Sequence, residues 1–486
     1  MDLPLDFSIL NKAMTPYPAS VRRFGDDWVL MAHDADQDWL LASGAAGRRY
    51  EGTAYNDTPL RWVKAPLNSV NAAALRDMFP FTSPAPVLKN DRTIGLGDRL
   101  GIAGRGHIMS VKPFDAVPVL AQQSPREISL TGRSFSDVLD AASFSVFCEG
   151  FTRGFGADGD HLKTATDVKQ ALNLGYTMIT LDCSEHIRSD ADTMSASDVG
   201  KSCALPHETK EFYLNKSFMI GDIEICMTLE QLQRNYLKYG AAIDFACDIY
   251  DSLISGYKGR VELEISLDET DTPTRPDQHF FTISELIRRG VILETVAPRF
   301  VGEFQKGVDY IGNLCDLKAD LKQHAAIARH FGYKLSIHSG SDKFSAYDII
   351  GRETLGRFHI KTSGTSWLTA MQLIAEKTPE LYRQAHRFAL ASFEQARKHY
   401  YVTTDLSLIP DVDALSDPDL KGVLSQNNER QLMHITYGLI LTKRREDGSY
   451  QFKDAMYSLW RQYMHEYADM LKEHIGAHLS LLYKSV

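Results

Sequence analysis

The sequence predicts an α/β protein built on a (β/α)8 TIM barrel, and three observations support this fold. Short apolar segments recur from residue 93 onward, and most of them are followed by a helical pattern, which is typical of repeated β-α units. There are eight such segments, which is the number that closes a barrel. Each segment also ends in a different polar cluster, and barrel enzymes take their catalytic residues from several strand ends.

The predicted strands lie in the middle of the chain, between residues 93 and 361. An open doubly wound sheet would show the same alternation, but no GxGxxG motif lies on a strand-to-helix turn, and GLGDRLG has the wrong spacing for a dinucleotide site. The eight segments are TIGLG at 93–97, AVPVLA at 116–121, RGFGAD at 153–158, YTMITLD at 176–182, VELEISL at 261–267, VILETVA at 291–297, YKLSI at 333–337 and RFHIK at 357–361.

Three segments lie outside this repeat. Residues 1–90 are rich in Trp, Asp and Gly without clear periodicity, and we expect an N-terminal capping segment ahead of a catalytic barrel at 91–365. The stretch 183–260 is much longer than an ordinary loop and predicts an insertion after the fourth strand, placed over the barrel mouth. Residues 366–486 carry apolar residues at helical spacing and predict a C-terminal helical region.

Composition excludes several classes of protein. The formal net charge is −10 and no long Lys/Arg run occurs, which argues against nucleic-acid and membrane-surface partners. The six cysteines form no CxxC pair and are expected to be reduced thiols. The N-terminus lacks the pattern of a signal peptide, and no apolar run is long enough to span a membrane. We therefore expect a cytoplasmic enzyme that acts on a small molecule. A homo-oligomer is compatible with the sequence.

Strand alternation separates residues that face the barrel interior from those that face the helices. In VELEISLDET the apolar residues face outward, so the alternate residues point inward, namely Glu262, Glu264, Ser266 and Asp268. A carboxylate inside a barrel is costly unless it binds a metal, a cation or a substrate, which favours a catalytic role for Glu264. The same alternation turns His338 inward at its strand end, where we expect a metal ligand.

Two further clusters complete the predicted site. FGADGDHLKT places Asp160 and His161 together after one strand, where base and metal-ligand roles are both available. APRFVGEFQKG supplies Glu303 as the expected third ligand, with Gln305 as its alternative. Other polar side chains at strand ends suit sugar hydroxyls and carboxylates, namely Arg99, Gln122, Lys163, Asp182, Gln305, Lys306 and Lys361.

Two other chemistries remain open from the residues alone. Lys361 also alternates inward and is a candidate Schiff-base lysine, although this role leaves the two histidines unexplained. The small residues of SGSDK and TSGTS would also suit a bound phosphate, since such turns free backbone N–H groups.

The strings GLGDRLG, AQQS-RE, DGDHLKT, LEISLDET, APRFVGEFQKG and IHSGSDKFS, in this order, resemble the tagaturonate/fructuronate epimerase family of hexuronate catabolism. The resemblance covers the chain from about residue 90 to residue 370. It implies a metal-dependent epimerase of D-tagaturonate and D-fructuronate, with Asp160 as proton acceptor and His161 and His338 as metal ligands. It also implies a proton donor in LEISLDET, for which the strand register selects Glu264, with Glu269 as the alternative. The metal, Zn, Mn or Ni, stays open.

The implied substrates differ at C4, which is not adjacent to the C2 ketone, so the C4 hydrogen is not an acidic α-proton. One route opens and recloses the C3–C4 bond in a retro-aldol step. The other route exchanges the C4 proton directly between two acids, and the split of acceptor and donor roles favours it. A metal-dependent ketose isomerase, a class II type aldolase and a non-catalytic sugar-acid binding barrel are the competing readings.

Overall fold

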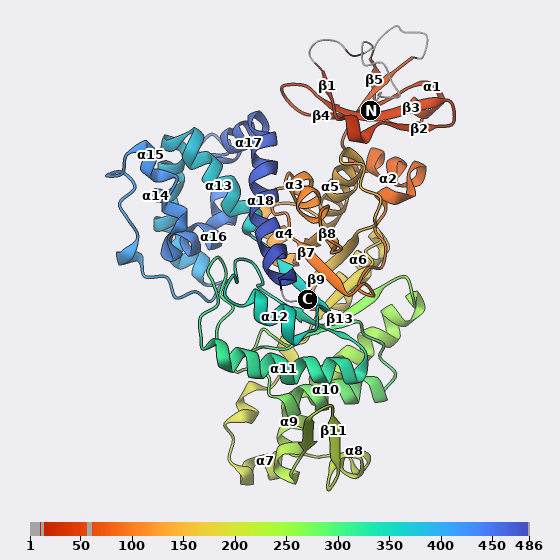
Figure 1. Cartoon of the computed structure of the whole chain (residues 1–486), viewed down its shortest axis with the longest axis vertical. Helices are drawn as coiled ribbons and strands as arrows, with labels where there is room; N and C mark the ends of the chain where they lie inside the picture. The colour runs from red at the N-terminus through yellow and green to blue at the C-terminus, as the bar shows by residue number, and fades with distance from the viewer. Residues whose placement is uncertain (1–9, 11–13, 56–60, 485–486) are drawn as a thin grey trace.

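The fold is centred on a closed barrel of eight parallel strands (Figure 1). This computed structural model describes residue 10 and residues 14–55 and 61–484. Around the barrel the strands follow the order β10-β13-β14-β15-β16-β7-β8-β9, so the predicted fold class is confirmed. The strands are β7 (Arg92–Leu96), β8 (Val117–Gln123), β9 (Gly156–Leu162), β10 (Met178–Asp182), β13 (Glu262–Ser266), β14 (Thr295–Ala297), β15 (Lys334–Ile337) and β16 (Phe358–Thr362).

Each strand overlaps one predicted segment, but the third strand is displaced. It was expected at 153–158, and β9 instead continues to Leu162. Asp160 and His161 therefore belong to the strand itself and not to the loop that follows it. The apolar faces of the strands are covered by helices, because these residues are buried against α3 (Gly104–Val111), α5 (Phe135–Cys148), α6 (Ala165–Leu174), α9 (Leu229–Ile249), α10 (Pro276–Arg288), α11 (Leu314–Phe331), α12 (Tyr347–Glu353) and α13 (Thr365–Lys377).

The N-terminal segment folds as an antiparallel sheet at one end of the molecule (Figure 1). Its central strands pair tightly, and α2 (Ser69–Met78) joins the sheet to the barrel by packing on α5. The strands are β1 (Thr15–Pro16), β2 (Arg22–Phe24), β3 (Asp27–His33), β4 (Asp38–Ala42), β5 (Thr53–Ala54) and β6 (Val63–Pro66), with the short helix α1 (Gly44–Gly47) after β4.

The segment between β10 and β13 lies at the opposite end of the molecule (Figure 1). It contains α7 (Ala196–Ser202), α8 (His207–Tyr213) and the hairpin β11–β12 (Ser217–Ile220 and Ile223–Cys226), followed by α9. The hairpin packs against the outer helices α10 and α11. The segment was expected to cover the barrel mouth, but no residue of 183–260 lines the cavity found there.

The C-terminal helices pack against one side of the barrel (Figure 1). The helix α14 (Pro379–Arg397) packs against α16 (Asn427–Thr442), and α17 (Lys453–Gln462) leads into α18 (Met464–Tyr483), which returns to lie on α3 and α12. The short α15 (Asp417–Leu420) lies between α14 and α16. None of the helices in the described ranges is long and apolar enough to cross a membrane.

The contact between α3 and α18 depends on a glycine and supplies a first prediction. A Cβ at Gly106 would lie 2.7 Å from the Leu471 Cβ and 2.9 Å from the Ala468 carbonyl oxygen. Because a backbone carbonyl cannot yield like a flexible side chain, we expect Gly106→Ala to lower the free energy of unfolding by about 1–3 kcal/mol. Chemical denaturation measures this change.

Gly476 on α18 is the matched control, since a Cβ there meets nothing within 4 Å. Gly476→Ala should stabilise the protein slightly, by up to about 1 kcal/mol, because alanine has the higher helix propensity. Equal effects of the two substitutions would contradict the close approach of α3 and α18.

Candidate active site and metal centre

A cavity of about 600 Å³ opens at the carboxyl ends of the barrel strands. This is the end where barrel enzymes place their active sites, and the volume suits a small sugar. Its wall includes most of the predicted site residues, namely Gln122, Asp160, His161, Glu303, Gln305, Lys306, His338 and Lys361, together with Arg126, Asp268, Glu269 and Arg299.

An irregularity at the end of β9 brings two adjacent residues into this cavity. Neighbours on a regular strand point to opposite faces, yet Asp160 and His161 both line the cavity. The register between β9 and β10 shifts at this point, and His161 has a φ of 53°, in the left-handed region that non-glycine residues rarely adopt. Strain of this kind is common at functional sites, and Ser339, next to His338, shows it too with a φ of 49°.

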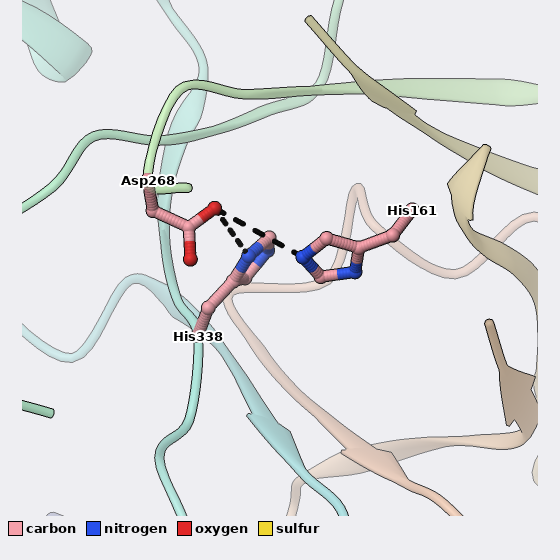
Figure 2. A group of neighbouring side chains, drawn as sticks. All are labelled: His161, Asp268 and His338. Carbon is pink, nitrogen blue, oxygen red and sulfur yellow. Dashed lines mark hydrogen bonds and ion pairs between the residues drawn. The ribbon is translucent and has the colours of Figure 1, made fainter. Parts of the chain in front are cut away.

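Two histidines and one carboxylate converge at the floor of the cavity (Figure 2). Asp268 Oδ1 lies 3.0 Å from His338 Nδ1 and 4.0 Å from His161 Nε2. The three ligand atoms all lie within 4.8 Å of one another. Ligand atoms about 2.1 Å from one tetrahedral ion are about 3.4 Å apart, so this spacing fits a shared divalent cation.

The second nitrogen of each histidine is held by a buried carboxylate. His161 Nδ1 lies 2.8 Å from Asp160 Oδ1, and His338 Nε2 lies 2.7 Å from Glu264 Oε1. A histidine that donates one N–H to a carboxylate presents the lone pair of its other nitrogen, which is the usual arrangement behind a metal-binding imidazole. The nitrogens left over are the two that face Asp268. The donor set therefore fits a divalent metal.

Lys361 lies beneath the histidines and neutralises the carboxylates that hold them. Its Nζ is 2.7 Å from Asp158 Oδ2, 2.8 Å from Asp160 Oδ1 and 2.8 Å from Glu264 Oε1. It also donates to the Thr180 hydroxyl. Every proton of the ammonium thus has an acceptor, and the amine is not the free nucleophile that a Schiff base requires.

The pKa values of this cluster follow from burial and from charges a few ångströms apart. Burial raises the pKa of Asp160, but Lys361 and His161 outweigh burial and hold it well below the ordinary value. Burial lowers the pKa of His161, but Asp160, Asp268 and Glu269 raise it to about 10. The raised pKa of His161 shows that the surrounding carboxylates stabilise a positive charge at this place. A bound cation would supply such a charge as well.

The carboxylate beside the histidines differs from the one expected. Glu303 lines the cavity, but it lies 3.5 Å from the Arg299 guanidinium, and Asp268 occupies the place next to the histidines. Asp268 follows the end of β13 and points inward as strand alternation predicted, but Glu303 was expected to be the ligand. Gln305, the alternative ligand, accepts hydrogen bonds from Thr403 and Gln431.

Glu264 points into the barrel as its register predicted, but it lies below the cavity. Its side chain is 0% exposed, and its oxygens accept from Thr295, Thr180 and His338 as well as Lys361. It is absent from the cavity wall, whereas Glu269 is part of it. Of the two predicted candidates for the second acid, Glu269 therefore lines the cavity and Glu264 does not.

The predicted substrate-binding residues divide into two groups. Gln122, Gln305, Lys306 and Lys361 line the cavity, but Arg99, Lys163 and Asp182 do not. Arg99 is fully buried and donates from Nε and Nη2 to Glu127, so its role is structural. Lys163 lies at the surface near three acids, one of which is the buried Asp182 at 3.5 Å.

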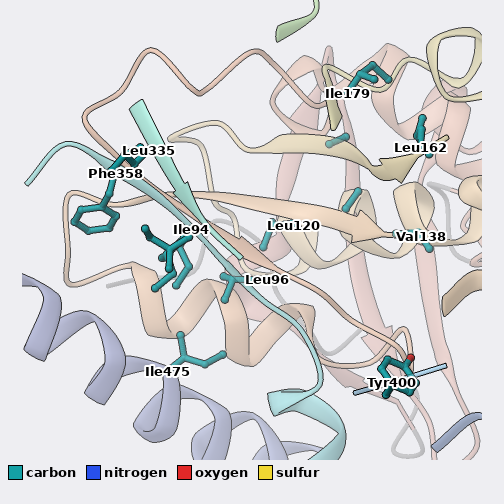
Figure 3. Close-up of a cluster of buried hydrophobic side chains, with 14 of the residues drawn as sticks. Ile94, Leu96, Leu120, Val138, Leu162, Ile179, Leu335, Phe358, Tyr400 and Ile475 are labelled. Carbon is teal, nitrogen blue, oxygen red and sulfur yellow. The ribbon is translucent and has the colours of Figure 1, made fainter. Parts of the chain in front are cut away.

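Part of the cavity wall comes from outside the barrel, which no sequence signal indicated. His399, Tyr400 and Tyr401 follow α14 and line the cavity. The Arg126 guanidinium lies 4.9 Å from the centre of the Tyr400 ring. Figure 3 shows Tyr400 and Ile475 of α18 among the buried residues that also include Ile94 and Leu120 of the barrel. The C-terminal helices are therefore part of the site.

Comparison with known proteins gives one consistent result. The family model described as tagaturonate epimerase matches residues 17–482. The tagaturonate/fructuronate epimerase of Thermotoga maritima is 39% identical over 418 residues, which is 85% of each chain. Two crystal structures of the fructuronate-tagaturonate epimerase UxaE of Cohnella laeviribosi, a glycerol complex and the native protein, are each 44% identical with TM-scores of 0.94. They cover 96% and 97% of both chains.

The charge network around Lys361 supplies a second prediction. We expect Lys361→Met to lower the free energy of unfolding by about 3–5 kcal/mol at pH 7, because it leaves buried carboxylates without their cation. Without the ammonium, the pKa values of Asp160 and Glu264 rise in the folded state above those of the unfolded chain. The free-energy cost of ionising these buried carboxylates then grows as pH rises. The loss of unfolding free energy should therefore be smaller at pH 5 than at pH 7.

Denaturant titrations at the two pH values measure this effect, with Lys163→Met as control. Lys163 is a third exposed, and such surface ion pairs contribute about 0–1 kcal/mol. A deficit for Lys361→Met that is equally large at both pH values would show that lost packing, and not charge, is responsible.

Proposed function

The chain belongs to the tagaturonate epimerase family, and we propose that it interconverts D-tagaturonate and D-fructuronate with the help of one divalent cation. The observation that carries the proposal is the convergence of His161, Asp268 and His338 at the floor of a sugar-sized cavity. His161 and His338 are the ligands that the sequence predicts, and Asp268 takes the place of Glu303. The bound ion would supply a Lewis acid that polarises the ketone of the substrate.

Asp160 is the acid–base residue of the proposed reaction. It contacts His161 Nδ1 and lines the cavity, and unlike Asp268 it does not face the two nitrogens left for a metal. Lys361 keeps its pKa well below the ordinary value, so Asp160 stays ionised but is a weak base. A weak base can take a hydroxyl proton when its loss is coupled to breaking the C3–C4 bond, but it is not suited to removing the unactivated hydrogen on C4.

The charges therefore favour the retro-aldol route over the direct exchange that the two predicted acids suggested. Asp160 accepts the proton of the C4 hydroxyl, the C3–C4 bond breaks, and its electron pair moves onto C3 and the adjoining ketone. C4 becomes an aldehyde carbon, which rotates and is attacked by C3 on its other face. Asp160 then returns the proton to the C4 oxygen. Glu269 lines the same cavity and can hold a neighbouring hydroxyl.

We also propose that the enzyme works in the cytoplasm, and that any homo-oligomer leaves this cavity open to substrate. All six cysteines lie in the described part of the chain and are free thiols, which supports a reducing compartment. The negative net charge supports a small-molecule substrate over nucleic acid.

Metal content tests the ligand set. Extensive treatment with a chelator should abolish epimerisation, and added Mn²⁺, Zn²⁺ or Ni²⁺ should restore it. His161→Ala, His338→Ala and Asp268→Asn should each lower the metal retained after dialysis at least tenfold, measured by elemental analysis. Glu303→Gln is the matched control and should retain metal as the parent does. Loss of metal in Glu303→Gln but not in Asp268→Asn would restore Glu303 as the ligand.

Reaction in deuterated water separates the two routes. The retro-aldol route keeps the hydrogen on C4 throughout, so fructuronate formed from tagaturonate should carry no deuterium at C4 by NMR. Asp160→Asn should lower kcat by about 10²–10⁴-fold when measured at saturating metal, since a general base is removed. Deuterium at C4 at a rate matching turnover would establish direct exchange instead.

A further inference from the structure

The cations that line the cavity differ in how far they are already paired. Lys361 contacts three carboxylates, Arg299 lies 3.5 Å from Glu303, and Arg126 lies 3.8 Å from Glu269. Within the described residues the Lys306 side chain has neither a hydrogen bond nor an ion pair, although it is half-buried in the cavity wall. An ammonium without a partner in such a place is free to bind an anion.

The backbone that carries Lys306 is held rigidly from below. The four consecutive carbonyls of residues 305–308 each accept a hydrogen bond from a long side chain. Lys343 Nζ donates to the first and the last of them, at 2.9 and 2.6 Å. Gln431 Nε2 donates to the second at 3.4 Å, and Arg430 Nε donates to the third at 2.6 Å. The loop is thus fixed while the lysine it presents stays unpaired, which is the form of a preorganised binding group.

Electrostatics around Lys306 favour an incoming anion. Burial lowers the pKa of Lys306, and Arg126 and Arg99 add to this effect, while Glu127 and Asp160 oppose it. Glu127 is itself engaged by Arg99. Asp160 likewise contacts Lys361. A bound carboxylate would therefore supply the direct counter-ion that Lys306 lacks among the described residues.

Neutral polar groups line the same cavity as Lys306. Gln305 Nε2 is a buried donor without an acceptor, and Gln122 Oε1 is a buried acceptor without a donor among the described residues. Both side chains line the cavity. Buried polar atoms left unpaired are rare in folded proteins, and a ligand that pairs them explains their presence. The first suits a carboxylate oxygen and the second suits a sugar hydroxyl.

We propose that Lys306 binds the carboxylate of the sugar acid, with Gln305 Nε2 as a second donor, and that this ion pair selects uronates over neutral keto sugars. The proposal rests on the proposed function, because it assigns one end of that substrate to one end of the cavity. In these substrates the carboxylate and the ketone lie at opposite ends of the carbon chain, so a carboxylate on Lys306 leaves the ketone free to reach the three-residue cluster His161, Asp268 and His338.

The test compares Lys306→Met with the parent on tagaturonate and on the corresponding neutral sugar, in which CH₂OH replaces the carboxylate. For tagaturonate, kcat/KM should fall about 10- to 100-fold, mainly through KM, because a charge-assisted hydrogen bond is lost. For the neutral sugar, kcat/KM should change less than about threefold. Lys306→Arg should recover part of the loss, and Lys318→Met, an exposed lysine on the helix after this loop, should change neither substrate.

Two outcomes would overturn the proposal. One is an equal loss on both sugars, which would show a structural role for Lys306. The other is an unchanged kcat/KM for tagaturonate in a variant whose unfolding temperature matches the parent. If the parent does not convert tagaturonate at all, the proposed function fails, and calorimetric binding of galacturonate and galactose still tests the subsite. If the parent binds galacturonate more tightly than galactose and Lys306→Met abolishes this difference, the assignment is supported. If the parent binds both sugars equally, the assignment is overturned.

Discussion

The ammonium of Lys361 is the interaction on which the rest of the site depends, because it allows three carboxylates to share the interior of the barrel. Its Nζ lies within 2.8 Å of oxygens from Asp158, Asp160 and Glu264. A single unpaired carboxylate buried in this way would cost several kcal/mol, and three together would repel one another. Two of these carboxylates fix the histidines of the metal centre. The position of the cation on β16 therefore sets the orientation of ligands that arise from β9 and β15.

A second buried lysine, Lys343, lies behind the cavity wall and holds different groups. Lys343 is also fully buried, and burial lowers its pKa to about 7, but its partners are backbone carbonyls and not carboxylates. Next to it, Asp342 accepts from Arg430 of α16 and His474 of α18. These contacts join the C-terminal helices to the loop that presents Lys306. One buried lysine thus organises the metal end of the cavity, and the other organises the cationic end.

Sequence reasoning reached the parts of the site that obey strand alternation. Glu264 and His338 face inward because their neighbours at alternate positions are apolar, and a periodicity of two is visible in the sequence. It failed where the backbone leaves that period. The displaced end of β9 and the positive φ of His161 depend on pairing with β10. Alternation did turn Asp268 inward, but its place beside both histidines depends on where β9 and β15 bring them. The contribution of Tyr400 depends on packing between segments far apart in the chain, and Arg99 was misassigned because its partner Glu127 lies on the next β-α unit.

The carboxylates near the metal centre differ in how deeply they lie in the barrel, although the sequence alone does not distinguish them. Glu264 is enclosed and engaged on both oxygens, so it can orient His338 but cannot meet a substrate. Asp268 contacts the histidines, and Glu269 borders the cavity. Asp160 and Asp268 both contact a histidine and line the cavity, but Asp268 faces the two nitrogens left for a metal, which leaves Asp160 for the substrate. A positive charge bound at the metal centre would lower the basicity of Asp160 further. A site built this way can move a hydroxyl proton readily, but it is poorly equipped to remove hydrogen from carbon, and the bond that yields under these conditions is C3–C4.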